Sequence, residues 1–111
     1  MFNSDQIIIY KDKNGQISVD VVLRDEMVWL NLTQLSELFV RDKSVISRHI
    51  KNILKEQELS EVSTVANFAT VQAEGGKSVT RQLEYYNLDM IISVGYRVNS
   101  RKAVEFRKWA S

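Results

Sequence analysis

Residues 32–54 read LTQLSELFVRDKSVISRHIKNIL, and this stretch decides the fold of the chain. In its first part, apolar side chains recur at helical spacing at Leu35, Leu38 and Phe39. A short polar segment around Asp42 follows, and the helical spacing then resumes. We therefore expect two short helices joined by a tight turn. The apolar side of the second helix carries Ile46, Ile50, Ile53 and Leu54.

The opposite side of the second helix is basic or hydroxylic. Lysine and arginine can reach phosphates or guanine edges, and serine can bond to backbone or base. A helix-turn-helix presents its second helix to the major groove of DNA in this way, and we place the motif at Thr33–Leu54. The same pattern also fits an ordinary helical hairpin with a solvated charged face. The candidate base-reading residues are Lys43, Ser44, Ser47 and Arg48.

Residues with capping side chains stand at the start of both expected helices. Thr33 can cap the first helix, and Asp42 or Ser44 can cap the second. A cap there places the N-terminal residues of the second helix at its outer end, where DNA readers make their contacts.

A small antiparallel β element is expected before the helices. The β-branched run Gln6–Tyr10 is followed by Asn14-Gly15, a pair that suits a turn with positive φ. Apolar residues alternate with other residues over Ile17–Arg24, which predicts a strand with one buried face. A third short strand is expected at Met27–Leu30.

A β-hairpin is expected directly after the second helix, over Val62–Tyr86. Its strands are Val62–Val71 and Ser78–Tyr86, with Gly75-Gly76 in the loop between them. In this position the hairpin would be the wing of a winged helix-turn-helix, although a plain edge hairpin that covers the core explains it equally well. The candidate phosphate contacts of helix and wing together are Arg41, Lys51, Lys55, Lys77 and Arg81.

Two further helices are expected at the C-terminal end of the sequence, Leu88–Val98 capped by Asn87 and Arg101–Ala110 capped by Ser100. The predicted fold is therefore α+β: a winged helix-turn-helix with a small N-terminal antiparallel β element and two C-terminal helices. We expect residues 1–111 to form one domain. Because the last helix reaches the chain end without a glycine stop, we also expect a longer polypeptide beyond it.

Composition excludes several classes of protein. The 111 residues contain no cysteine, which excludes disulfides, zinc fingers and thiol catalysis. The sequence has no apolar run of the ~18 residues needed to span a membrane. It also has no basic segment of the kind that begins a secretory signal, so we expect a cytoplasmic protein.

The net charge of +1 conceals two basic blocks. Residues 41–55 carry five basic side chains against Asp42, and residues 97–111 carry five against Glu105. A protein with two such blocks can have a localised positive face. The sequence leaves open whether the 97–108 block shares the face of the first block.

We find no catalytic, metal or cofactor motif. His49 is the only histidine, so there is no histidine pair for a metal or a proton relay. Ser47 lies two residues from it and cannot face it on a helix. The segment Gly75-Gly76-Lys77 lacks the full spacing of a phosphate loop. The last helix is a candidate surface for a homodimer, through Val104, Phe106 and Trp109, although these residues fit completion of the core equally well.

From Thr33 to Ala110 the sequence resembles the RhuM family of virulence-associated bacterial proteins. The resemblance rests on RDKSVISRHIKNI at 41–53, VANFAT at 65–70, YNLDMIISVGYRVNS at 86–100 and AVEFRKWA at 103–110. The tail is more distantly similar to the N-terminal domains of phage antirepressors and BRO-type proteins. The resemblance implies a longer protein of bacterial or mobile-element origin and supplies no catalytic residue.

The leading hypothesis is a non-enzymatic module that binds double-stranded DNA and regulates transcription. One alternative is a protein-interaction module on a winged-helix scaffold, which the acidic content outside the basic blocks favours. Another is the front domain of an enzyme whose chemistry lies beyond Ser111.

Overall fold

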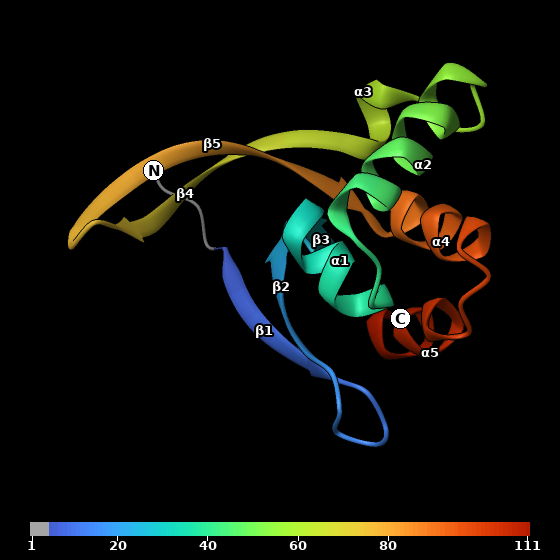
Figure 1. The fold of residues 1–111 in the computed structure, drawn as a ribbon, viewed down its shortest axis with the longest axis horizontal. Helices are drawn as coiled ribbons and strands as arrows, with labels where there is room; N and C mark the ends of the chain where they lie inside the picture. Colours follow the sequence, from blue (N-terminus) through green and yellow to red (C-terminus); the bar gives the residue numbers. More distant parts are fainter. Residues whose placement is uncertain (1–4) are drawn as a thin grey trace.

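The computed structural model describes residues 5–111 and confirms an α+β fold. Within these residues, one five-stranded antiparallel sheet with strand order β1-β2-β3-β5-β4 is combined with five helices (Figure 1). The strands are β1 (Gln6–Lys11), β2 (Ser18–Arg24), β3 (Met27–Asn31), β4 (Val65–Glu74) and β5 (Lys77–Asn87). The helices are α1 (Leu32–Phe39), α2 (Lys43–Lys55), α3 (Glu61–Thr64), α4 (Leu88–Arg97) and α5 (Lys102–Ala110).

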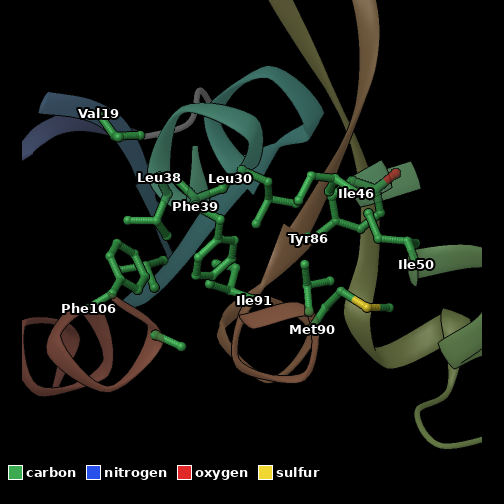
Figure 2. Packing of buried hydrophobic residues seen from close by; sticks show 14 of the residues in the cluster. Val19, Leu30, Leu38, Phe39, Ile46, Ile50, Tyr86, Met90, Ile91 and Phe106 are labelled. Carbon is green, nitrogen blue, oxygen red and sulfur yellow. The ribbon is translucent and has the colours of Figure 1, made fainter. Parts of the chain in front are cut away.

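The main core lies between the helices and one face of the sheet. Val19 and Val21 of β2 and Leu30 of β3 point into it, as the alternation in the sequence predicts. Figure 2 shows these strands meeting helical side chains from both halves of the chain, among them Phe39 of α1 and Phe106 of α5. The predicted apolar face of the second helix is confirmed, because Ile46, Ile50 and Ile53 are buried here.

A second apolar cluster lies on the other face of the sheet and was not expected from the sequence. Val22, Phe68 and Tyr85 are buried there, with Trp29 beside them. The rings of Phe68 and Tyr85 stack with centroids 5.0 Å apart, and the Arg24 guanidinium lies 3.7 Å from the Phe68 ring centroid. The strand that was predicted to have one buried face is therefore covered on both faces at its C-terminal end.

The expected hairpin exists but its boundaries differ from the prediction. Residues 62–64 form part of the short helix α3, so the first strand begins at Val65 rather than Val62. Glu74 pairs with Lys77, which leaves only Gly75 and Gly76 in the turn, with φ of 57° and 79°. Two glycines with positive φ suit the tight turns that join twisted strands, so the strands extend further than predicted. The hairpin projects well beyond the helices (Figure 1).

The caps of the helices confirm some of the sequence predictions and correct others. Asn31, not Thr33, caps α1. Its side chain accepts a hydrogen bond from the backbone N–H of Gln34, and the Gln34 side chain accepts one from the backbone N–H of Asn31. Asp42 and Asn87 cap α2 and α4 as predicted. At α5 the Ser100 hydroxyl accepts from the Lys102 amide at 3.2 Å, although the capping position itself is Arg101.

Candidate nucleic-acid interface

The turn between α1 and α2 is tight and its geometry is fixed by backbone hydrogen bonds. Val40 ends α1 in the left-handed conformation with φ of 53°, and the Arg41 amide donates to the Ser36 carbonyl at 3.2 Å. The Asp42 carboxylate then accepts from both the amide and the hydroxyl of Ser44. These two hydrogen bonds lower the pKa of Asp42 and fix the start of α2.

The outward face of α2 carries a stripe of hydroxylic and basic side chains. Ser44, Arg48, Lys51 and Lys55 are spaced four, three and four residues apart, which places them on one side of a helix. All four are exposed, whereas the opposite side of α2 is buried in the core. Ser47 is half-buried at the border between the two sides. We call Ser44, Arg48, Lys51 and Lys55 the α2 stripe.

The cations of α2 have no acidic partner within the described part of the chain. The ion pairs of residues 5–111 involve only Arg24, Arg81 and Arg97 on the basic side. The exposed Lys43 and the three cations of the α2 stripe are therefore free to meet an anion from outside. Because no carboxylate within the described residues neutralises them, this surface is positively charged.

Arg41, which was predicted to contact phosphate, is engaged within the protein. Its guanidinium donates to the carbonyls of Phe39 and Val40 at the end of α1, and to the carbonyl of Val98 after α4, each at 3.3 Å. These bonds occupy carbonyls that a helix end leaves without an intrahelical partner. Arg41 thus ties the α1–α2 turn to the end of α4.

The start of α2 faces the base of the hairpin. Lys43 lines a hollow together with Thr33 of α1 and with Gln82 and Glu84 of β5. Sequence reasoning did not single out Gln82 and Glu84. Period-two alternation from the buried Tyr86 would have placed both on the face of β5 that looks toward the helices.

The hairpin contributes less positive charge than its two basic residues suggest. Arg81 is paired with Glu74 through two hydrogen bonds of 3.0 and 2.7 Å. Lys77 at the turn is exposed and forms no ion pair within residues 5–111. Of the two predicted wing contacts, only Lys77 is therefore available without breaking an ion pair.

The second basic block does not extend the positive surface of α2. Arg97 lies between the two blocks and binds Glu56 at 2.7 Å and Glu58 at 2.8 Å. Its single positive charge stands against two carboxylates, so this cluster at the C-terminal end of α2 is net negative. The remaining exposed cations of the block belong to α5 or the residue before it, and they are Arg101, Arg107 and Lys108.

The predicted dimer surface on the last helix is largely used for packing within the chain. Phe106 is fully buried, and its ring meets that of Tyr10 with centroids 5.0 Å apart. Trp109 also packs edge-on against Tyr10, at 5.1 Å. Only Val104 of the three predicted residues is substantially free of such packing.

His49 lies half-buried on α2, away from the stripe. Burial lowers the pKa of His49, and the charges of Arg48 and Arg97 lower it further. The surroundings of His49 therefore disfavour its protonated form.

We expect acidification to destabilise the fold through His49. The unfolded chain binds a proton near the ordinary pKa of 6.5 and the folded protein binds it less readily, so the free energy of unfolding falls as the pH drops below that value. Urea denaturation at pH 7.5, 6.5 and 5.5 measures this slope, and His49→Gln should flatten it. An equal slope in wild type and variant would assign the pH dependence to other groups.

The described residues do not support a metal centre or a membrane span. No group of three histidine, cysteine, aspartate or glutamate side chains within residues 5–111 is arranged to hold a metal ion. Over the same range, none of the helices has the length and apolar character required to cross a bilayer.

Comparison with known proteins finds a family similarity for part of the chain. The model of the virulence protein RhuM family matches residues 63–111. Over this segment, a little less than half of the chain, the protein is similar to the RhuM family. The RhuM match covers the β4–β5 hairpin, α4 and α5 but does not include α1 and α2. No curated protein and no solved structure matches the chain.

Proposed function

We propose that this protein binds double-stranded DNA by placing α2 in the major groove, as transcriptional regulators with a helix-turn-helix do. The observation that carries the proposal is the α2 stripe, whose three cations are exposed and unpaired within the described residues. With 13 residues, α2 is about 20 Å long. A rod of that size fits a groove about 12 Å wide.

The order of the elements supports a winged-helix arrangement. The helices α1 and α2 follow β3, and the β4–β5 hairpin then returns so that β5 pairs with β3. The hairpin is thereby anchored beside the start of α2, where Lys43 meets β5. In this proposal, a duplex bound along α2 also contacts the projecting hairpin, and this contact would make the hairpin a wing.

We propose different roles for the candidate residues, guided by the contacts that each makes within the protein. Lys43, Ser44, Ser47 and Arg48 occupy the first turns of α2 and are proposed to face base edges. The candidates for phosphate contacts that need break no internal bond are Lys51, Lys55 and Lys77. Arg41 and Arg81 are proposed to act mainly in holding the turn and the hairpin, since their side chains are already bonded.

The test is the salt dependence of binding to random-sequence duplex DNA. We expect measurable binding at 50 mM salt, with log K falling linearly with log salt concentration and a slope of about −3 to −4. That slope corresponds to about four neutralised phosphates. Fluorescence anisotropy of a labelled duplex of about 20 base pairs measures it. No binding at 50 mM salt would exclude the proposal.

A second candidate function, the docking of another protein, is favoured by a separate surface. Tyr96 of α4 is 85% exposed and borders a hollow that Ile92 and Val104 also line. Large exposed aromatic side chains are enriched at protein interfaces. If duplex binding is absent at low salt, this surface becomes the leading candidate, and Tyr96→Ala is the variant with which to examine it.

A further inference from the structure

The outer edge of β1 is unusually prone to association for an exposed strand. β1 is the terminal strand of the sheet, and nothing in residues 5–111 pairs with its outer edge. Its sequence QIIIYK contains three consecutive isoleucines and no proline, and Ile7 and Ile9 are 62% and 56% exposed. Natural proteins usually protect such an edge because it can pair with another strand.

The backbone of β1 has a row of hydrogen-bonding groups that face outward. The Asp12 amide donates to the Ile17 carbonyl at 3.2 Å, in the same register as the pairing of β1 with β2. In an antiparallel pair, alternate residues bond to the neighbour while those between them point away. The amide and carbonyl groups of Ile7, Ile9 and Lys11 therefore point to the free edge.

We propose that β1 pairs with β1 of a second copy of this chain, antiparallel, about a two-fold axis at Ile8. Ile7 then lies opposite Ile9 of the second copy, and Asp5 lies opposite its Lys11. Two-fold symmetry repeats both pairs, so each end of the contact joins a carboxylate to an ammonium group. The sheet becomes continuous across ten strands, and this contact does not depend on the proposed DNA binding.

The charge pattern selects this register over its neighbours. All four of these residues point to the same face of the sheet, because they are separated by even numbers of positions. Arg24 already orients Asp5 there, because its Nε and Nη2 donate to the two carboxylate oxygens at 2.7 and 2.5 Å. Lys11 of the second copy would therefore join an existing ion pair. A shift of one register step in one direction sets Asp5 against isoleucine, and a shift in the other direction sets Lys11 against isoleucine. Only the register centred on Ile8 pairs both isoleucines and both charges.

The contact is small, so we expect a weak dimer. A six-residue strand buries less area than the ~800 Å² per partner of a standard interface. A dissociation constant on the order of tens of micromolar is the result we expect for the wild-type chain. Sedimentation velocity from 5 µM to 1 mM covers that range.

Charge-reversal variants test the register directly. Lys11→Glu places like charges opposite each other at both ends of the contact, and Asp5→Lys does the same with cations. Each variant alone should associate at least about tenfold more weakly than wild type. An equimolar mixture of the two variants has opposite charges at both ends again and should form a heterodimer with near wild-type affinity.

Lys51→Glu on α2 is the matched control, because it makes the same charge change at an exposed site away from β1. It should leave the dissociation constant unchanged. Circular dichroism spectra of all variants check that they fold. A wild-type chain that remains monomeric at 1 mM overturns the proposal. So does association that Lys11→Glu does not weaken, or a mixture of the two variants that does not associate.

Discussion

Replacing Arg48 and Lys51 together by alanine is expected to weaken duplex binding by about 2–4 kcal/mol. Both side chains belong to the exposed α2 stripe and bond to no other residue in the described part of the chain. If Arg48 reads a guanine edge, its loss costs about 1–3 kcal/mol and relaxes sequence preference. Loss of a phosphate contact by Lys51 weakens all sequences alike and lowers the salt slope by about one unit.

The matched control for this double variant is Arg101→Ala with Lys108→Ala. It removes the same charge from exposed positions around α5, beyond the net negative cluster that Arg97 forms with its two glutamates. Anisotropy titrations of both double variants at one salt concentration give the comparison. Equal losses of affinity would mean that net charge alone drives binding, and the assignment of α2 would then be wrong.

Gly95→Ala is expected to cost about 2 kcal/mol of folding free energy. A Cβ atom on Gly95 would lie 2.4 Å from the Cβ of Ala103 and 3.0 Å from the ring of Phe39. Because Ala103 cannot rotate its Cβ away, α5 has to move from α4, and overpacking of this kind costs about 1–3 kcal/mol. Equilibrium denaturation with urea measures the loss.

A rescue experiment separates this clash from a general intolerance of α4. Ala103→Gly removes the colliding atom, at a cost of about 1 kcal/mol for glycine within a helix. The double variant Gly95→Ala, Ala103→Gly should therefore be more stable than the sum of the two single effects allows, by 1 kcal/mol or more. Strictly additive effects would show that the two helices do not meet at these residues.

The pair of helices α1 and α2 was the part of the fold that the sequence predicted best. Its apolar spacing and polar outer face are both carried by local periodicity, and the capping role of Asp42 follows from residue type and position. The first cap was placed wrongly at Thr33 because Asn31 also ends β3, so the helix begins as soon as the strand ends.

The second apolar cluster shows what local patterns leave out. Val22 was expected on a polar face, yet it is buried against Phe68, a residue far along the chain. The alternation within β2 alone cannot reveal that side chains of β4 and β5 cover its outer face. Long-range packing of this kind also decides that Phe106 belongs to the core rather than to a dimer surface.

The sequence predicted which cations belong to the candidate site. It did not predict which of them are free of internal bonds and therefore available to bind DNA. Arg41 and Arg81 carry the same charge as Lys51, and only the structure assigns them to internal carbonyls and to Glu74. Side-chain partners depend on how elements meet in space, which composition and spacing do not encode. The ion pairs of Arg97 with Glu56 and Glu58 likewise depend on how the elements meet in space.

The most direct measurement of the central claim is a footprint of duplex DNA on the protein by NMR. Amide chemical shifts of the isotope-labelled chain are followed while a random-sequence duplex is added at low salt. We predict that the largest changes fall on Ser44–Lys55 of α2, with smaller ones near Lys77 at the hairpin turn. Changes confined to α5 or to the β1 edge, with α2 unaffected, would contradict the account.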